Sequence, residues 1–130
     1  MVIDIINEIY TNLKTTLTDV TVLQNYPSTT PIFPCLVIEE ISNTSNLNTI
    51  NTLGEQYNDI TFEINIFSDK TNKLSEVKKI RGEVDAIMSG QYRMSRSSSN
   101  SIPNYLDTDV YRYNLRYDCT IGETKQLFRR

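Results

Sequence analysis

Tyrosines and arginines alternate along residues 110–121, and this is the pattern in the sequence best suited to binding a ligand. Exposed tyrosine rings stack on nucleic-acid bases when arginines on the same surface contact the phosphates. Successive side chains of a strand point to opposite faces, however, so the alternation separates the two types. One face carries Tyr111, Tyr113, Leu115, Tyr117, Cys119 and Ile121, and the other carries Arg112, Asn114, Arg116, Asp118 and Thr120. We therefore predict a half-buried strand whose tyrosine face belongs to a core or an interface.

Two acidic patterns could supply catalytic carboxylates, and one of them is the Glu-x-Lys triplet of metal-dependent nucleases. Glu76, Val77 and Lys78 match a Glu-x-Lys triplet, but that triplet must lie on a strand, and the spacing of apolar residues places it on a helix with Val77 inward. Glu39 and Glu40 are neighbours in a predicted strand, so they point to opposite faces. We predict no catalytic residue and no enzyme activity.

The composition excludes several kinds of site. Without any histidine, the chain cannot build a Ser-His-Asp triad or a histidine zinc site, and its scattered glycines form no phosphate-binding loop. Cys35 and Cys119 lie far apart in apolar runs, which favours buried free thiols over a disulfide or a metal site. A net charge of -3 disfavours general nucleic-acid binding. We predict no cofactor and no metal.

The chain of 130 residues suits one domain with one core. Apolar residues spaced by three and four predict amphipathic helices over residues 2–17 and 70–89, the second ending at Gly90. Alternation predicts strands at residues 20–22, 36–41, 55–69, 91–96 and 110–121, and residues 97–104 are predicted as a loop. Strands in neighbouring pairs with two helices predict an α+β domain, in which two amphipathic helices pack on one face of a mostly antiparallel sheet.

The polar face of this sheet gives the arginines a structural use. If the two long strands pair, Glu63 lies within cross-strand reach of Arg112 or Arg116. No stretch of about 18 consecutive apolar residues is present, so we predict no membrane span.

The ordered features resemble the tail terminator, or tail completion, proteins of long-tailed bacteriophages. The resemblance covers residues 1–123. It lies in the N-terminal helix, YPSTTPIFPCLVIEEISN, DITFEINIFSD, LSEVKKIRGEVDAIMSG, YRMSRSSSNS and VYRYNLRYDCTIGE. Head-tail connector and head-closure adaptors of the phage neck share this size and style and are the alternative; a nuclease or a nucleic-acid-binding module lacks the residues.

The resemblance implies a virion protein that assembles in the host cytoplasm into a ring, typically a hexamer, on top of the tail tube. Such a ring stops tube polymerisation and presents the surface to which the head and its connector proteins dock. Genome DNA would pass through it without base recognition. The implied partners are therefore copies of the chain itself, the tail tube protein and the connector proteins.

Ring assembly would also explain apolar residues on polar segments. A polar excursion at about residues 43–55 carries Leu47, Ile50 and Leu53, which we interpret as a surface covered by a neighbouring subunit or by the tube. The proline-rich arm with Tyr26 and Phe33, and a short tail from about residue 123 that ends in LFRR, are further candidates. A mobile surface segment is the alternative for each. Glu63, Arg112 and Arg116 are candidates for a polar face that lines the lumen or meets the next subunit.

Overall fold

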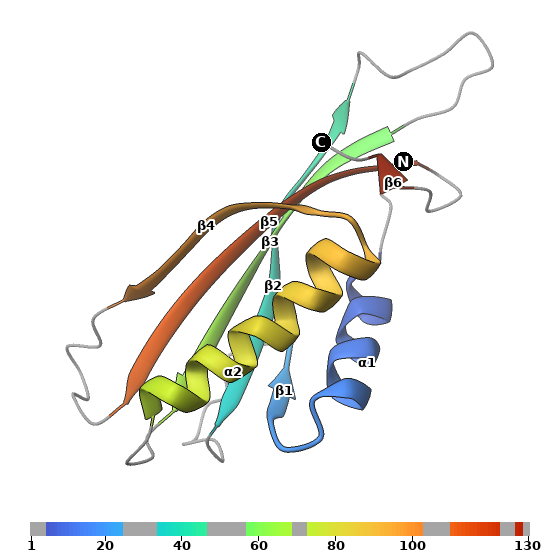
Figure 1. The fold of residues 1–130 in the computed structure, drawn as a ribbon. Helices are drawn as coiled ribbons and strands as arrows, with labels where there is room; N and C mark the ends of the chain where they lie inside the picture. Colours follow the sequence, from blue (N-terminus) through green and yellow to red (C-terminus); the bar gives the residue numbers. More distant parts are fainter. Residues whose placement is uncertain are drawn as a thin grey trace, which may run out of the picture.

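The computed structural model describes residues 5–24, 34–46, 57–68, 73–102, 110–122 and 127–128. They form one twisted sheet with both helices on one of its faces, so the predicted α+β architecture is confirmed (Figure 1). In chain order the elements are α1 (Ile6–Thr16), β1 (Thr21–Leu23), β2 (Cys35–Asn46), β3 (Tyr57–Ser68), α2 (Lys73–Asp85), a π-helical segment (Ala86–Gln91), β4 (Ser95–Ile102), β5 (Tyr111–Gly122) and β6 (Leu127–Phe128).

The strand order is β1-β2-β3-β5-β4, with β6 also paired to β5. The pairs β2–β3, β3–β5, β4–β5 and β5–β6 are antiparallel, as predicted for most of the sheet. The β1–β2 pair is parallel and departs from that prediction. A long connection between these two strands allows the chain to return in the same direction, which a tight turn would not.

The core lies between the helices and the face of the sheet that they cover. This inner face is built from alternate residues of the strands, because only every second side chain of a strand points toward the helices. The apolar stripes of α1 and α2 complete it, as the spacing predicted. The fully buried members include Ile9, Leu13, Leu36, Ile38, Phe62, Ile64, Ile66, Val77, Val84, Leu115 and Tyr117.

The predicted excursion at residues 43–55 is wrong for its first part, because β2 continues through residues 43–46. The strand passes a β-bulge at Ile41, after which Asn43 is opposite Ile60 in β3. The Asn58 amide also donates a hydrogen bond to Asn43 Oδ1 at 2.7 Å. Polar side chains did not end the strand, because its pairing is a backbone ladder that a neighbouring strand supplies. The other candidate residues of these surfaces, Leu47, Ile50, Leu53, Tyr26 and Phe33, lie outside the described residues.

The end of the second helix also differs from the prediction. Gly90 does not end it, because the backbone continues from Asp85 as a π-helical segment through Gln91. The left-handed residue that follows is Arg93, with a φ of 55°. This segment places Gln91 and Tyr92 beside the first helix, where the Asn12 amide donates hydrogen bonds to Gln91 Oε1 at 2.9 Å and to the Tyr92 hydroxyl at 3.3 Å.

The last strands are longer and later than the sequence indicated. Residues 91–94 were predicted as a strand but precede β4, and the serines predicted as a loop form β4 itself. Serine has a weak preference for strands, but β5 offers a long edge on which the segment pairs. The predicted C-terminal tail likewise contains β6, in which Leu127 pairs with Ile121.

Candidate functional site

The sheet face that points away from the helices, here called the outer face, brings the three predicted polar residues together. The β3–β5 register places Glu63 directly opposite Arg116. Arg116 Nη2 lies 2.9 Å and Nε 3.0 Å from Glu63 Oε2, so the predicted cross-strand contact is confirmed. Arg112 is the third of these residues, and its guanidinium lies 5.6 Å from the centre of the Phe67 ring.

Asn65 joins the two arginines into a single cluster. Its amide donates to Glu63 Oε1 at 3.0 Å, while its Oδ1 accepts from Arg112 Nε at 3.2 Å and from the Asn114 amide at 3.0 Å. We call Glu63, Asn65, Arg112, Asn114 and Arg116 the Asn65 network. Asn65 is fully buried, at 0% exposure, whereas the side chain of Arg116 is 50% exposed. The network therefore fixes the direction of an arginine that solvent or a partner can reach.

Asn65 and Asn114 were not predicted as members of this site. Both stand at outward positions of amphipathic strands, where an asparagine is expected to be solvated. The feature that could have identified them is the pairing register, which places Asn65 directly opposite Asn114. Once Glu63 is set against Arg116, the positions two residues along each strand must also face each other.

Opposing influences act on the pKa of Glu63. Burial is the largest of them and raises the pKa. Hydrogen bonds from Asn65 and Arg116, together with the charges of Arg116 and Arg112, outweigh it, so the pKa is below its ordinary value of 4.5. The Glu63 carboxylate is therefore ionised in the folded protein near neutral pH.

We expect acid to remove the stability that Glu63 contributes. Because its pKa is lower in the folded than in the unfolded chain, the contribution is complete above about pH 4.5 and disappears as the pH falls through the folded value. Glu63→Gln should cost about 1 kcal/mol near neutral pH, because its partner Arg116 is half exposed. Urea unfolding near neutral pH and in acid measures the difference.

That difference should vanish in acid for Glu63→Gln, where the wild-type carboxyl is also neutral. Glu8→Gln, at an exposed position on α1, is the matched control and should show little effect at either pH. An equal cost for Glu63→Gln under both conditions would show that its charge is not what the network uses.

Two threonine–aspartate pairs continue the outer face toward the other end of the long strands. Thr61 Oγ1 donates to Asp118 Oδ1 at 2.6 Å, and Thr120 Oγ1 donates to Asp59 Oδ1 at 2.6 Å. Each pair joins β3 to β5, and each threonine orients one carboxylate. The described residues contain no group of three or more side chains placed to hold a metal ion. The outer face is thus a mixed polar surface with fixed side chains.

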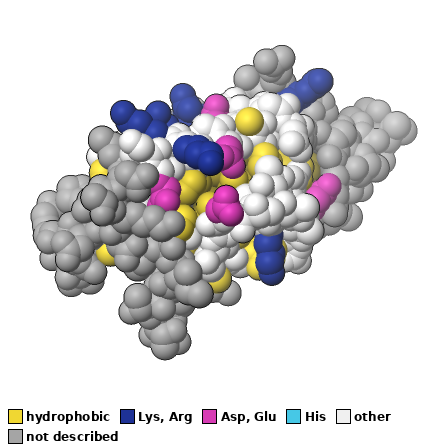
Figure 2. Space-filling view, turned by 60° about the horizontal axis from the view of Figure 1, so that its bottom comes forward, with side chains coloured by type: hydrophobic (Ala, Val, Ile, Leu, Met, Phe, Trp, Pro, Cys, Tyr) yellow, Lys and Arg dark blue, Asp and Glu magenta, His cyan; other side chains and the backbone are white. Residues whose placement is uncertain are grey.

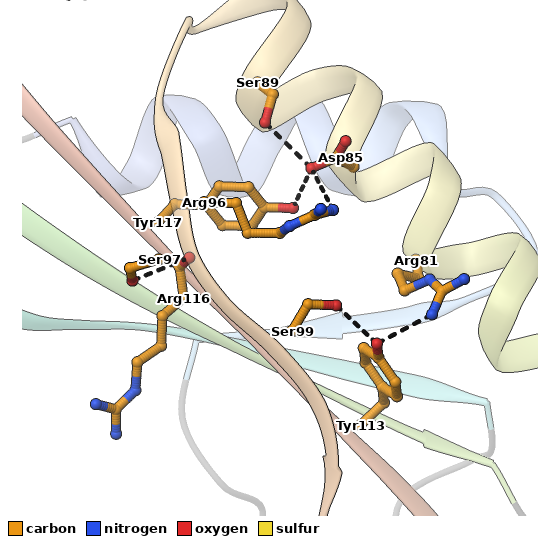
Figure 3. A network of polar contacts seen from close by, with 9 residues as sticks. All are labelled: Arg81, Asp85, Ser89, Arg96, Ser97, Ser99, Tyr113, Arg116 and Tyr117. Atoms are coloured by element: carbon orange, nitrogen blue, oxygen red, sulfur yellow. Dashed lines mark hydrogen bonds and ion pairs between the residues drawn. The ribbon is translucent and has the colours of Figure 1, made fainter. Parts of the chain in front are cut away.

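A second polar cluster lies on the inner face, between α2, β4 and β5 (Figure 3). Asp85 Oδ1 accepts hydrogen bonds from the Tyr117 hydroxyl at 2.9 Å, from Ser89 Oγ at 3.1 Å and from Arg96 Nη1 at 3.3 Å. Tyr117 is fully buried, and burial followed by its bond to Asp85 raises its pKa. Asp85 therefore satisfies the polar end of a core tyrosine.

Tyr113 lies on the same strand as Tyr117 but binds a positively charged residue, Arg81, whereas Tyr117 binds the negatively charged Asp85. Its hydroxyl accepts from Arg81 Nη1 at 3.0 Å and lies 2.7 Å from Ser99 Oγ, and the Arg81 guanidinium is 5.2 Å from the ring centre. Burial acts most strongly on the Tyr113 pKa and raises it. The bonds from Ser99 and Arg81 and the nearby positive charges outweigh burial, so the net pKa is lowered.

Two charged side chains of α2 are therefore more than a solvated surface. Arg81 and Asp85 are half-buried and bind the two tyrosines of β5. The prediction that the tyrosine face belongs to the core is confirmed by the burial of Tyr113 and Tyr117. The residue that could have indicated these bonds is the tyrosine itself, because a buried hydroxyl needs a partner.

Two residues of the Glu-x-Lys triplet have structural contacts. Val77 is fully buried on α2, as its spacing predicted, and Glu76 Oε1 accepts a 2.6 Å hydrogen bond from Ser68 Oγ. Cys35 and Cys119 are buried thiols that are not joined in a disulfide, as expected, and burial raises the pKa of the Cys35 thiol to about 11. A thiol with so high a pKa is a poor nucleophile.

An open cleft of about 640 Å³ lies between the end of α1, the turn at residues 17–20, Pro34 and α2. Its charged lining residues are of both signs, with Lys79 beside Asp19, Glu76 and Glu83. Basic and acidic side chains are also interspersed on the face shown in Figure 2. The described surface in that view therefore has no single strongly basic region of the kind that binds nucleic acid.

None of the described helices has the length and apolar character needed to cross a membrane. No protein-family model matches the sequence, and no curated protein shows significant similarity to it.

Proposed function

We propose that this chain is a structural virion protein that forms a ring at the top of a phage tail tube. The ring stops tube polymerisation and provides the docking surface for the head. The order and character of the elements resemble the tail terminator proteins, and the α+β fold has the architecture that this resemblance implies.

The observation that carries the proposal is the outer face. The helices cover one side of the sheet, and on the other side the Asn65 network holds exposed charge in a fixed direction. Ordering flexible side chains on association costs roughly 0.5–1.5 kcal/mol each, and a network that is already ordered avoids this cost. Such a surface suits repeated contacts in an assembly. In a ring it faces the lumen or a neighbouring protein.

The net charge of the chain supports a role in which DNA passes close to the protein without being bound tightly. The net charge is -3, and acidic groups such as Asp59, Glu63 and Asp118 lie on the outer face. Phosphate binding needs an excess of cations, because the affinity comes from neutralised phosphates. A lumen of this character would let genome DNA pass without retaining it.

We expect the purified protein to form rings, either alone or when tail tube protein is added. A ring gains its stability from closing head-to-tail contacts, and a tube end provides a template for closure. Light scattering measures the mass, and negative-stain imaging shows the rings and their position on the tubes. Tubes polymerised with the protein present should be capped and should stop growing.

The control is tube polymerisation with the same protein after heat unfolding. A protein that stays monomeric with tube protein present, while the tubes grow as they do in the control, would contradict the proposal. Rings that bind a head connector and leave tube growth unchanged would instead place the chain at the neck.

A further inference from the structure

The turn between the π-helical segment and β4 holds an arginine in a backbone conformation that arginine disfavours. Arg93 has a φ of 55°, and it is the one residue other than glycine with a positive φ in the part of the chain that the structure describes. Glycine adopts this conformation without the steric clash that its Cβ causes in other residues. Strained residues persist where their surroundings fix them, and they are common at functional sites. Arg93 is also exposed to solvent.

Hydrogen bonds fix the turn on both sides of this arginine. The Met94 N–H donates to Met88 O at 3.0 Å, and both methionines are buried. Asn12 of α1 donates to the side chains of Gln91 and Tyr92, which precede the arginine. The backbone that presents the guanidinium is therefore already ordered.

The guanidinium of Arg93 is without a partner among the described residues, because it makes no hydrogen bond, ion pair or ring contact with them. The other described arginines each bind a side chain of the same subunit: Arg81, Arg96, Arg112 and Arg116. The forked donors of a guanidinium match a carboxylate or a phosphate. An ordered, exposed arginine that has no such partner in its own subunit is suited to bind one outside it.

The open cleft beside the end of α1 has the chemistry to receive an arginine side chain. Its lining includes the apolar residues Leu17, Val20 and Ile80 together with the acids Asp19 and Glu83. An arginine has an apolar stem and a charged head, so it suits a site with apolar walls and carboxylates. Within the described part of the chain, neither of these two carboxylates makes an ion pair or a hydrogen bond.

The arginine and the cleft lie at opposite ends of the helix layer. The cleft reaches α2 along residues 75–83, whereas Arg93 follows the end of the π-helical segment at Gln91. From Glu83 to Gln91 the helical backbone advances roughly 10 Å. In Figure 1 the turn after α2 and the connection from α1 to β1, which lines the cleft, are at opposite ends of the helices. Different patches on two ends of a subunit suit the head-to-tail contacts that close a ring.

From these observations we propose that Arg93 of one copy binds in the cleft of the next copy, with its guanidinium on Asp19 and Glu83. The inference deepens the proposed function, and the role of this contact as the ring joint rests on that function. A carboxylate of a second copy is favoured over a nucleic-acid phosphate, because the chain has a net charge of -3 and phosphate binding needs an excess of cations. Both patches belong to the helix layer and its connections, so the contact leaves the outer face of the sheet uncovered.

Two charge-reversed variants test the contact. Arg93→Glu changes the turn, and a cleft variant carries Asp19→Lys together with Glu83→Lys. Each variant alone places like charges at the joint, so it should need about tenfold more protein than the parent to form rings, with or without tail tube protein. An equimolar mixture should restore assembly, because each variant supplies the charge that the other lacks. Light scattering and negative-stain imaging measure the rings.

Lys78→Glu is the matched control, because it makes the same change of charge at an exposed position of α2 that does not line the cleft. It should assemble as the parent does. Arg93→Gly is a second test, since it removes the guanidinium and relieves the left-handed backbone. Its melting temperature should not fall, which excludes misfolding, while its assembly should weaken as that of Arg93→Glu does.

Rings that form equally well with Arg93→Glu and Arg93→Gly would overturn the inference and leave the proposed function standing. Two weakened variants whose mixture does not recover would also overturn it, because the charges would then not meet across a joint. Parent complexes that both variants weaken and their mixture restores, without rings or tube capping, would support the contact and contradict the proposed function.

Discussion

Replacing Asp85 with alanine should lower the free energy of unfolding by about 2–3 kcal/mol, mainly because the buried Tyr117 hydroxyl loses its hydrogen-bond acceptor. The Tyr117 hydroxyl is fully buried and donates to Asp85 Oδ1 at 2.9 Å. Without that acceptor, a buried donor is left unsatisfied, which costs about 1–3 kcal/mol. Arg96 and Ser89 lose the same acceptor and add a smaller cost, because Arg96 lies near the surface.

A double-mutant cycle measures how much of the cost of Asp85→Ala comes from the Tyr117 hydroxyl that is left without an acceptor. Tyr117→Phe alone should cost about 1 kcal/mol, since it removes one hydrogen bond and leaves Asp85 with Arg96 and Ser89. Asp85→Ala combined with Tyr117→Phe should be less destabilised than the sum of the single variants by about 1 kcal/mol or more, because no buried donor then remains. Urea unfolding of the four proteins gives the coupling directly.

The matched control is Glu83→Ala, which removes another partly exposed acid from the same helix and should change the unfolding midpoint little. Strict additivity in the cycle would mean that the two side chains do not depend on each other. Asp85→Asn is informative as well, because its amide oxygen can still accept from Tyr117 and should preserve part of the stability.

The elements that bury apolar side chains were predictable from the sequence. Period-two alternation identified the inward residues of β3 and β5, and Tyr113 and Tyr117 are buried where the alternation placed them. Spacing of three and four identified the buried stripes of both helices. Burial of apolar surface dominates folding, so a pattern that reports burial also reports the fold.

Polar segments were the least predictable part of the fold. Residues 43–46 and the serines of β4 have no alternation of apolar residues, so they were interpreted as loops. They are strands because β3 and β5 provide edges on which any backbone can pair. The helix end predicted at Gly90 was also wrong. A glycine indicates a helix end only where a left-handed residue is needed, and Arg93 takes that conformation here.

The sequence predicted one contact of the candidate site, the pairing of Glu63 with an arginine. It did not predict the Asn65 network around that contact. The pairing of Glu63 with Arg112 or Arg116 followed from strand parity and opposite charge. Asn65 did not, because an outward asparagine carries no charge or hydrophobicity that a pattern can register. Its importance depends on the exact neighbour in β5 and on burial at 0% exposure, both of which need the three-dimensional structure.

Asn65→Ala should be among the most damaging substitutions on the outer face. The Asn65 side chain makes hydrogen bonds with Glu63, Arg112 and Asn114, at 3.0, 3.2 and 3.0 Å. At about 1 kcal/mol for each bond, its loss should lower the free energy of unfolding by about 3 kcal/mol. This corresponds to a fall in the melting temperature of roughly 10 °C for a domain of this size.

Asn100→Ala, at an exposed position of β4, is the matched control and should change the melting temperature by little. NMR titration of the Glu63 carboxyl provides a second measurement, which a general loss of packing would not reproduce. Because Asn65 donates to Glu63 and helps to lower its pKa, Asn65→Ala should raise that pKa toward 4.5. A pKa that stays low in Asn65→Ala would show that the arginines hold the carboxylate without Asn65. In that case Asn65 would not join the two arginines into one network, and the outer face would not be the ordered surface on which the assembly proposal depends.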